Sequence, residues 1–508
     1  MEPLTYCNPL PIPSIPSGRW LDTDLTHADP ADFPDYRSIS DPSVVYDDGK
    51  WILYPSYAVA WVSEDFVHWR HADVGVPHLR YSPAVVKFRG KWYLTGHSVK
   101  EMYVSDSPLG PFVPCGEITD AHGNVTAVGD PCLFADGDRL YLYWTYCGAP
   151  EAGEDVELVT GTAGVEMDPD RPWQMLGEPV LVNRFDPSVP WQRIGEHNEN
   201  LRMGWVEGQW MKKIGSRYYL LYSGSGTEYS TYANGIAVSD EGPLSGFRPQ
   251  KKHDPLTRKA HGLMRGAGHG CLTDGPGGTL WTFYTCLFCC NHMYERRIGM
   301  DPVGIDEDGE LYCPAVTETP QFAPGVLPHP EQGSGTGWLP LTFLQRPTAT
   351  SHAPGRDPIY ASDDSVLTWW QPAEDDPEPC ITFPLGQPGR ATVFEVHAVR
   401  LIWRDIGMET AKGVLPGPFR YIIEYASDPG LSDWRMLIDA SENTEDLPID
   451  YRQTEAVRAH GIRLKILDSP EEITPGVCSL TAFGEAAVRQ PTDESVRPCP
   501  PATTQWNE

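Results

Sequence analysis

Three carboxylate residues stand at the start of apolar, strand-like stretches that lie far apart in the chain. Asp41 occurs in "SISDPSVV", Asp130 in "VGDPCLF" and Glu207 in "WVEGQWM". Hydrolysis by general acid and base needs one carboxylic acid that protonates a leaving oxygen and one carboxylate that activates water. A third carboxylate near the acid would raise the pKa of that acid by like-charge repulsion and keep it protonated near neutral pH.

Each of these residues also has a purely structural explanation. Asp before Pro commonly starts a turn, because its side chain bonds to nearby backbone, and Glu207 before a glycine fits an exposed turn. The occurrence of three carboxylates at equivalent strand starts is harder to assign to chance than any one of them. They form one site only if the fold brings these strand starts together.

The first 310 residues repeat one plan five times. Each unit has a short apolar strand, a turn rich in Gly and Asp, and a second strand dense in Trp, Tyr and Leu. The units are residues 43–69, 84–112, 132–146, 209–247 and 271–286. Tight turns such as "DDGK" and "FRGK" favour antiparallel neighbours, and helical periodicity is nearly absent. The pattern predicts an all-β chain that begins with a five-bladed β-propeller, with a sandwich or barrel as the alternative.

A propeller would join the strand starts in one funnel, because the innermost strand of each blade runs along the central axis. Tyr81 and Ser82 in "RYSPAVV" and His269 in "GAGHGCL" occupy comparable places in the second and fifth units. A histidine between glycines is also typical of a packed turn. Carboxylates that meet among aromatic rings suit the hydrolysis of a glycosidic bond, since the rings can stack on sugar faces.

Composition and net charge indicate which classes of molecule the protein can bind. The 508 residues are 40% hydrophobic and 21% charged, and 39 Lys and Arg against 70 Asp and Glu give a formal net charge of −31. This charge disfavours nucleic acids and anionic membrane surfaces, whereas a neutral carbohydrate is compatible with it. The N-terminal residues lack a signal peptide, and no window resembles a membrane span, so we expect a cytoplasmic protein.

Three of the 12 cysteines are close together in "YTCLFCCNH", where His292 follows them. A zinc site is one interpretation of Cys286, Cys289 and Cys290. The spacing lacks a second pair elsewhere in the chain, so reduced core thiols are favoured.

Seven motifs in order give the first part of the chain a family resemblance. They are "NPL", "SDPSVV", "YSPAVV", "DPCLFADGDRLYL", "VEGQWMKK", "GHGC" and "ERRIGMDPVGIDEDG". Over residues 5 to 312 the sequence resembles glycoside hydrolase family 43, whose members are five-bladed propeller enzymes that act on arabinofuranosides, xylosides and related sugars. The resemblance implies a catalytic domain over residues 1–312.

The resemblance also implies roles for individual residues. Asp41 would be the general base, Asp130 the carboxylate that tunes the acid and orients substrate, and Glu207 the general acid of an inverting reaction. His269 matches the family histidine on the axis, which often holds a structural calcium ion through water, although the reaction requires no cofactor. Arg296 matches the arginine that reaches the sugar, with Arg297 as the alternative in register.

Two departures from the family pattern affect the substrate contacts. Tyr81, Ser82 and a proline stand where the family often has Trp-Ala-Pro, which changes the surface that would stack on sugar. Residues 151–200 separate the third unit from the fourth and could form a lid, a subsite wall or a surface excursion. Glu196 and Glu199 lie in this segment and are alternatives to Glu207 as the acid.

The composition and the strand pattern of the sequence change after the fifth repeated unit. Residues 313–345 are rich in Pro and Gly, and this composition predicts a linker. Residues 346–485 contain "DDSVLTWW", "FPLG", "YIIEYASDPGLSDW" and "LTAFG", and they resemble the discoidin, or coagulation factor type C, family of galactose-binding-like jelly rolls. We expect this β-sandwich to support the propeller, with sugar binding at Trp369 and Trp370 as the alternative. Residues 486–508 are polar and predict a loose tail.

These observations together predict an inverting, exo-acting glycoside hydrolase. Its glycone would be terminal α-L-arabinofuranose, with β-D-xylose and β-D-galactofuranose as alternatives, because pocket walls and not the carboxylates distinguish these sugars. A non-catalytic carbohydrate-binding protein is the alternative from another class, and an interaction scaffold is the third. The sequence leaves the oligomeric state open.

Overall fold

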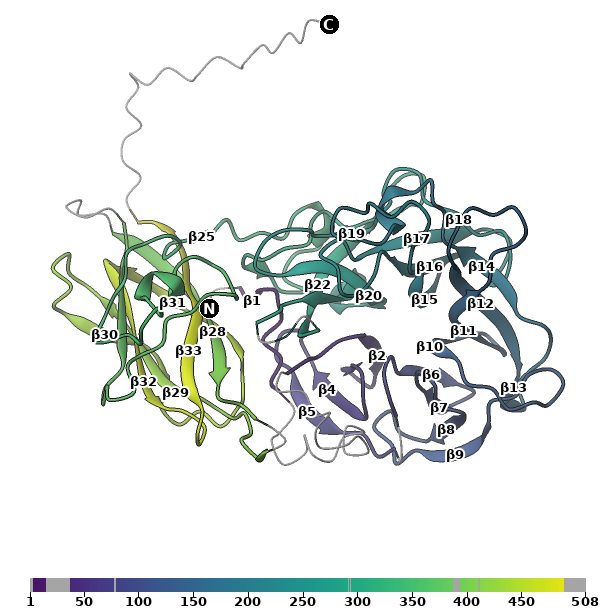
Figure 1. The fold of residues 1–508 in the computed structure, drawn as a ribbon, viewed down its shortest axis with the longest axis horizontal. Coiled ribbons are helices and arrows are strands. Elements are labelled where there is room, and N and C mark those ends of the chain that lie inside the picture. The colour runs from purple at the N-terminus through teal and green to yellow at the C-terminus, as the bar shows by residue number, and fades with distance from the viewer. Residues whose placement is uncertain are drawn as a thin grey trace, which may run out of the picture.

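The computed structural model describes residues 3–14, 37–76, 79–290, 292, 294–386, 393–409 and 412–487. Within these ranges the chain is almost wholly β-structure. The helices are short 3-10 turns at η3 (Pro190–Gln192), η4 (Pro276–Gly278), η5 (Pro330–Gln332) and η6 (Pro358–Ala361). A larger ring of sheets lies beside a smaller pair of sheets (Figure 1). Most of the predicted loose tail, 488–508, falls outside the described residues.

The ring consists of five antiparallel sheets, each built from strands that follow one another in sequence. Sheet one contains β2 (Ser43–Asp47), β3 (Lys50–Tyr54), β4 (Val59–Ser63) and β5 (Arg70–Asp73), and sheet two contains β6 (Ala84–Phe88), β7 (Lys91–Thr95), β8 (Glu101–Ser105) and β9 (Val113–Glu117). Sheet three contains β10 (Gly129–Asp136), β11 (Arg139–Gly148), β12 (Val159–Asp168), β13 (Arg171–Met175) and β14 (Val180–Arg184). Sheet four contains β15 (Glu207–Ile214), β16 (Arg217–Gly224), β17 (Ala233–Ser239), β18 (Arg248–Pro249) and β19 (Thr257–Arg258). Sheet five contains β20 (Arg265–Asp274), β21 (Leu280–Leu287), β22 (Arg296–Ile305) and β23 (Leu311–Tyr312).

Hydrophobic clusters between neighbouring sheets close the ring. Separate clusters join sheets one and two, two and three, three and four, and four and five. A further cluster joins sheet one to sheet five, where Trp51 and Phe66 pack with Trp281 and Phe283. Apolar burial of this kind stabilises by about 25 cal/mol per Å². The prediction of an all-β, five-bladed propeller is therefore confirmed.

Part of the segment 151–200 belongs to the third blade. Strand β12 pairs with β11 along its length, and β13 and β14 both pair with β12. These strands complete a sheet of which the sequence repeat revealed only β10 and β11. Residues 159–184 are thus outer blade strands, and neither a lid nor a surface excursion.

The N-terminal residues lie along the fifth blade before the chain enters the first. Strand β1 (Thr5–Tyr6) pairs with β24 (Gln321–Phe322). The side-chain amide of Asn8 donates to the backbone oxygen of Met300 at 2.8 Å, and its oxygen accepts from the backbone nitrogen of Met300 at 3.0 Å. These bonds tie the start of the chain to β22.

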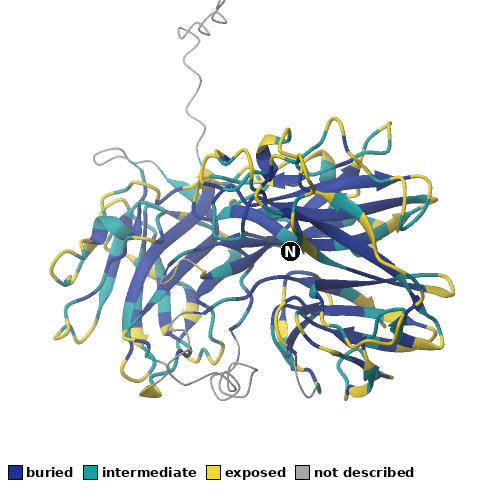
Figure 2. Cartoon of the chain, turned by 45° about the vertical axis from the view of Figure 1, so that its right-hand side comes forward, coloured by how far each residue is buried: buried dark blue, intermediate teal, exposed yellow. Residues whose placement is uncertain are grey.

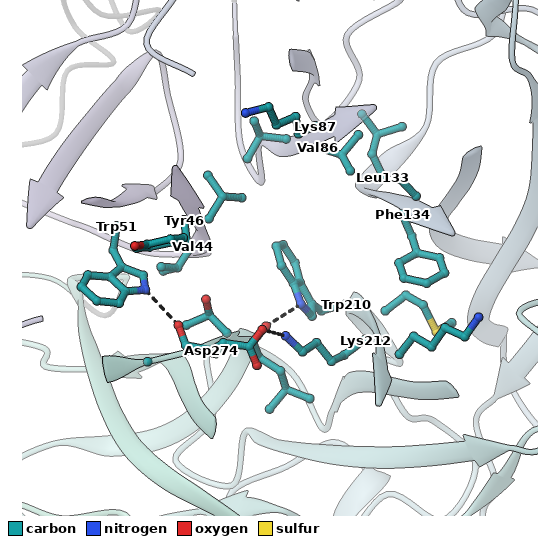
Figure 3. Close-up of a pocket in the computed structure, with 18 of the residues that line it drawn as sticks. Val44, Tyr46, Trp51, Val86, Lys87, Leu133, Phe134, Trp210, Lys212 and Asp274 are labelled. Atoms are coloured by element: carbon teal, nitrogen blue, oxygen red, sulfur yellow. Dashed lines mark hydrogen bonds and ion pairs between the residues drawn. The ribbon is translucent and has the colours of Figure 1, made fainter. Parts of the chain in front are cut away.

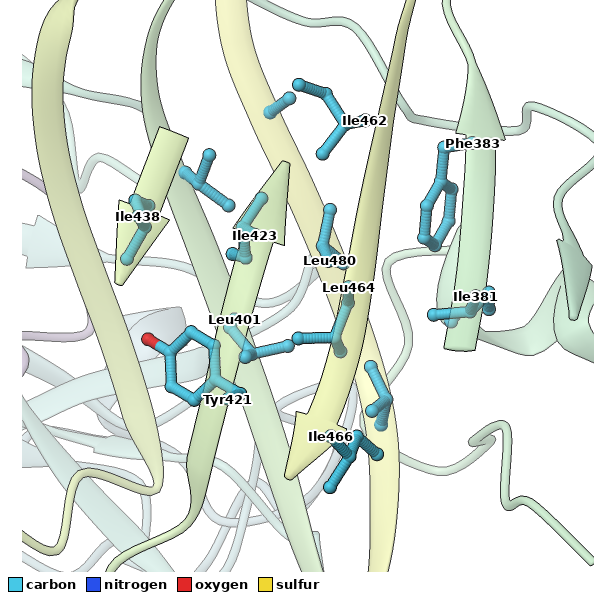
Figure 4. Close-up of a cluster of buried hydrophobic side chains, with 14 of the residues drawn as sticks. Ile381, Phe383, Leu401, Tyr421, Ile423, Ile438, Ile462, Leu464, Ile466 and Leu480 are labelled. Atoms are coloured by element: carbon cyan, nitrogen blue, oxygen red, sulfur yellow. The ribbon is translucent and has the colours of Figure 1, made fainter. Parts of the chain in front are cut away.

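The second domain consists of two sheets that face each other across one core (Figure 4). One sheet has the order β25 (Leu339–Pro340), β33 (Thr474–Ala486), β28 (Phe394–Ile406) and β31 (Ile449–Ala459). The other has the order β26 (Thr348–Ala349), β27 (Cys380–Pro384), β32 (Gly461–Asp468), β29 (Arg420–Ala426) and β30 (Trp434–Ala440). Leu401 and Leu480 from the first sheet pack with Ile423 and Leu464 from the second. A second β domain is therefore present, while its assignment as a jelly roll of the discoidin family stays a prediction.

Buried polar groups and thiols join the two domains. The Arg37 guanidinium pairs with Asp405 at 2.5 Å and also with Asp446. The side chains of Arg37 and Asp405 are 3% exposed, and that of Asp446 is 11% exposed. Figure 2 shows that buried strands run through both domains, while exposed residues gather in loops. The buried thiols of Cys290, in the propeller, and Cys478, in the second domain, lie 3.6 Å apart across the interface between the two domains. Burial raises the pKa of Asp446 to about 6 against the opposing effect of Arg37.

Replacing Arg37 by alanine should destabilise the protein by about 3–5 kcal/mol, because two buried carboxylates would lose their cation. Chemical unfolding followed by tryptophan fluorescence measures this change. The matched control is Arg420→Ala, which breaks an exposed ion pair with Asp468 and should cost less than about 1 kcal/mol. Equal stability of the two variants would show that the interface does not depend on Arg37.

Candidate functional site

The innermost strand of each blade carries a left-handed backbone kink at or near its start, and in the fifth blade the kink is the fifth residue of β20. Asp41, Ser82, Asp130, Gly208 and His269 have φ values of 57°, 46°, 43°, 60° and 36°. A residue other than glycine in this left-handed region costs roughly 1–2 kcal/mol, and such residues concentrate at functional sites. A kink of this kind therefore lies near the start of the innermost strand in every blade, at or next to the positions that the sequence selected.

Glu207 lies one residue before the kink and not at it. Glu207 is opposite Ser223 in the β15–β16 ladder, as Gly129 is opposite Thr145 in the β10–β11 ladder. The sequence-based alignment of Glu207 with the two aspartates was thus wrong by one position. A bulge follows each of these two residues, so Glu207 is equivalent to Gly129 and not to Asp130.

Asp41 is a buried carboxylate surrounded by donors. It accepts from Arg296 at 3.2 Å, Ser56 at 2.6 Å and Ser40 at 3.0 Å, and the Nδ1 atom of His269 lies 3.3 Å away. Burial alone would raise the pKa of Asp41, but the charges of Arg296 and His269 and the Ser56 hydrogen bond outweigh it and lower this pKa. Asp41 is therefore ionised at neutral pH.

Asp130 is held in a second set of hydrogen bonds. Its Oδ1 atom accepts from Ser82 at 2.9 Å and lies 2.9 Å from Nδ1 of His97, and Thr145 donates to Oδ2 at 3.3 Å. Burial raises the pKa of Asp130, yet the His97 hydrogen bond and the charges of His269 and His97 bring it well below its usual range. The Asp130 hydrogen bond in turn raises the pKa of His97.

Glu207 has donors but no cation. Tyr232 donates to Oε1 at 2.8 Å and Trp205 donates to Oε2 at 2.5 Å, and no ion pair to Glu207 occurs within the described ranges. Burial, followed by the negative charge of Asp130, raises the pKa of Glu207 to about 8. The sequence-based expectation named like-charge repulsion as the cause, whereas burial is the larger one.

The three carboxylates therefore differ in charge at neutral pH. Asp41 and Asp130 are ionised, and Glu207 carries a proton. An ionised base and a protonated acid within one electrostatic environment are the pair that hydrolysis requires.

His269 connects the two aspartates by both of its ring nitrogens. Nδ1 faces Asp41 at 3.3 Å, and Nε2 lies 3.2 Å from the Ser82 hydroxyl, which itself donates to Asp130. The calcium ion expected at His269 stays a prediction, and none of the proposed chemical steps depends on a metal.

The residues expected to contact substrate lie at different depths. Tyr81 is 44% exposed, and its ring lies 5.3 Å from that of Tyr57 and 6.2 Å from that of His97. Ser82, by contrast, is only 4% exposed and points at Asp130. Tyr81 is thus available to a ligand, whereas Ser82 positions Asp130.

The two neighbouring arginines face different parts of the molecule. Arg296 contacts Asp41 and also donates to Thr227 at 3.1 Å. Arg297 donates to the backbone oxygen of Arg37 at 2.5 Å and pairs with Glu295 at 2.8 Å. Arg296 therefore belongs to the site, and Arg297 belongs to the packing beside the second domain.

Glu196 and Glu199, the alternative candidates for the general acid, accept hydrogen bonds from other residues. Glu196 accepts from both the backbone nitrogen and the hydroxyl of Ser230. Glu199 accepts from the backbone nitrogen of His197 at 2.9 Å, and this hydrogen bond contributes to lowering its pKa. A carboxyl with a lowered pKa is a poor proton donor, so Glu207 is the stronger acid candidate.

Sequence reasoning missed six side chains that hold the carboxylates. They are Ser40, Ser56, His97, Thr145, Trp205 and Tyr232. Trp205 stands two positions before Glu207, and this spacing is the one signal that could have found it. The others come from strands or loops whose sequence carries no mark of the contact.

A cavity of about 730 Å³ opens elsewhere on the propeller axis (Figure 3). Its walls come from later positions on the innermost strands, such as Val44, Phe134 and Trp210. The acid that it contains, Asp274, is paired with Lys212 at 2.6 Å. This end of the axis lacks the acid and base pair and is not the catalytic candidate.

The tryptophans proposed as a sugar platform are both interior. Trp370 is fully buried, and Trp369 is 9% exposed with the guanidinium groups of Arg356 and Arg404 3.3 and 3.7 Å from its ring centroid. These positions favour a packing role over sugar stacking.

The family model described as glycosyl hydrolases family 43 matches residues 36–311. The chain belongs to this family, and its propeller with three buried carboxylates is a glycoside hydrolase domain. None of the curated proteins matches the chain. No helix in the described residues is long and apolar enough to cross a membrane.

Three solved structures are among those to which the chain is similar. A thermostable family-43 glycoside hydrolase is 22% identical, with 63% of this chain and 99% of that chain covered and a TM-score of 0.49. A variant of the GH43 protein BlXynB from Bacillus licheniformis is 14% identical, with 95% and 98% covered and a TM-score of 0.45. An alpha-L-arabinofuranosidase from Clostridium thermocellum is 18% identical, with 55% and 94% covered and a TM-score of 0.39.

The raised pKa of Glu207 predicts a stability effect that is independent of activity. Between pH 4.5 and about 8, Glu207 keeps its proton in the folded protein but loses it in the unfolded chain. The contribution of Glu207 to the free energy of unfolding therefore falls as the pH rises through this range. Glu207→Gln does not titrate, and its stability relative to wild type should increase by a few kcal/mol from pH 4.5 to pH 8. Unfolding measurements across this range test the sign. A constant difference would mean that the pKa of Glu207 is not raised.

Proposed function

We propose that the protein is an inverting, exo-acting glycoside hydrolase that releases terminal α-L-arabinofuranose from oligosaccharides or glycan side chains. The observation that carries this proposal is the contrast between Asp41, which pairs with Arg296 at 3.2 Å, and the buried Glu207, which accepts from the neutral donors Tyr232 and Trp205. This contrast lowers the pKa of Asp41 and leaves that of Glu207 raised to about 8. The two residues belong to different blades and have different partners, and the proposed reaction requires that they act on opposite sides of the bound sugar ring.

Glu207 would donate its proton to the glycosidic oxygen as the bond to the leaving group breaks. Its high pKa supplies this proton at neutral pH, and the bonds from Tyr232 and Trp205 fix its two oxygens. The ionised Asp130 contributes to the raised pKa of Glu207. Asp130 therefore acts as the residue that tunes the acid.

Asp41 would remove a proton from the attacking water. Arg296 keeps Asp41 ionised, and Ser56 and Ser40 bind its Oδ2 atom. Attack by water on the face opposite the leaving group inverts the anomeric configuration in one step. Neither carboxylate forms a covalent intermediate in this scheme.

Tyr81 and Arg296 would contact the sugar, while Ser82 and His97 hold Asp130 and His269 joins the two aspartates. The carboxylate residues are less than 10% exposed, at 4% for Asp41, 9% for Asp130 and 8% for Glu207. Such limited access favours one terminal residue over an internal position of a polymer. The limited access therefore supports exo action, whereas the walls of the pocket would select the glycone.

The first test is hydrolysis of p-nitrophenyl α-L-arabinofuranoside, β-D-xyloside and β-D-galactofuranoside by wild type and Asp41→Asn. Wild type should cleave the arabinofuranoside best, and its product should first appear by NMR as the inverted anomer. Asp41→Asn should lose at least about 10³-fold in kcat/KM, since the base is gone. Binding of these sugars without any turnover would instead support the non-catalytic alternative, and preference for another sugar would change the glycone.

The role of Glu207 predicts a dependence on the leaving group. Glu207→Gln should lose roughly 10²–10⁴-fold on an unactivated disaccharide and far less on an activated aryl glycoside, because only the former needs the proton. Glu199→Gln is the matched control and should retain wild-type rates on both substrates. An equal loss on both substrates in Glu207→Gln would contradict its role as the acid.

A further inference from the structure

The first sheet of the second domain carries a cluster of three metal-binding side chains on neighbouring strands. Glu395 on β28 lies directly opposite Glu485 on β33, and His397 follows Glu395 by two positions. One donor atom from each of the three residues lies within 4.8 Å of the others. This cluster is remote in sequence from the propeller carboxylates and is not used by the proposed reaction.

A bulge brings His397 to the carboxylates. The pairing of β28 with both β31 and β33 shifts between Val396 and Ala398, so His397 has no opposite residue in either ladder. Bulges of this kind re-aim a side chain. The His397 side chain is largely buried, with 8% of the residue exposed, and its ring stacks on Trp338 at 4.6 Å with an angle of 8°. The imidazole is therefore held in one orientation.

The negative charges of Glu395 and Glu485 favour the binding of a cation between them. Two carboxylates directly opposite each other in an antiparallel pair repel and destabilise the sheet. Arg458 on β31 approaches Glu395 at 3.4 Å, and its side chain is 70% exposed, so it compensates only weakly. A divalent ion between Glu395 and Glu485 would remove the repulsion.

We propose that Glu395, His397 and Glu485 bind a zinc ion. One imidazole and two carboxylates are ligands that Zn²⁺ accepts, with water in the remaining position. Calcium is disfavoured, because it takes oxygen ligands and would leave the imidazole unused. Glu485 is exposed and can rotate to close the remaining gap between the donors.

The location assigns this ion a structural role. The ligands join β28 to β33, and the Trp338 ring that stacks on His397 belongs to the segment that leads from the propeller to this sheet. Binding should therefore stabilise the second domain and should not change the rate of hydrolysis.

The test is calorimetric titration of Zn²⁺ into the full-length, EDTA-treated protein, with the melting temperature recorded in parallel. Wild type should bind one zinc ion that Glu485→Gln and Glu395→Gln bind at least tenfold more weakly, and zinc should raise the melting temperature of wild type more than theirs. His397→Asn should show the same loss. The matched control is Glu455→Gln, an exposed glutamate on β31 of the same sheet, which should bind as wild type does.

The two glutamate substitutions keep the proposal falsifiable if His397→Asn fails to fold, because both change only carboxylates that are partly or fully exposed. Unchanged zinc affinity in Glu485→Gln and Glu395→Gln would overturn the proposal, since thiols or other histidines would then hold the ion. The absence of zinc uptake by wild type would overturn it as well. Neither outcome depends on glycosidase activity, so this test is separate from that of the proposed function.

Discussion

The ion pair between Arg296 and Asp41 is the interaction on which the candidate site depends. It provides a cation for one buried carboxylate, while Glu207 has none within the described residues, and this asymmetry separates the pKa values of a base and an acid. The two partners are 255 positions apart, on the fifth and first blades. Closure of the ring between these blades is therefore a condition for the chemistry. The aromatic cluster that joins them supplies the apolar burial that holds the ring closed.

The same closure holds the remaining polar groups together at some cost in stability. Four residues other than glycine adopt a left-handed backbone at the strand starts, and two aspartates are buried as charged groups. Buried charges persist when hydrogen bonds satisfy them, and the chain from Asp41 through His269 and Ser82 to Asp130 does so. The packing between blades offsets these costs, since each pair of neighbouring blades shares an apolar cluster.

The second domain is connected to the site through the segment before Asp41. Arg37 pairs with Asp405 and Asp446 of this domain, and Ile39, two positions further on, donates its backbone N–H to the oxygen of Arg296 at 3.0 Å. The domain therefore anchors the chain four residues before the proposed base. This arrangement fits the expected supporting role of the second domain, which stays a prediction.

The sequence alone determined the all-β class, the five repeated units and the three strand starts that carry carboxylates. It could do so because turn chemistry and strand alternation are local properties. It did not reveal that Glu207 lies one residue before the kink or that residues 159–184 complete the third blade, and it left Arg297 open as the alternative to Arg296. Those features depend on bulges and on contacts between blades. The difference in proton affinity between Asp41 and Glu207 was decided only by the tertiary structure, because burial and the charges of residues brought together by ring closure set each pKa.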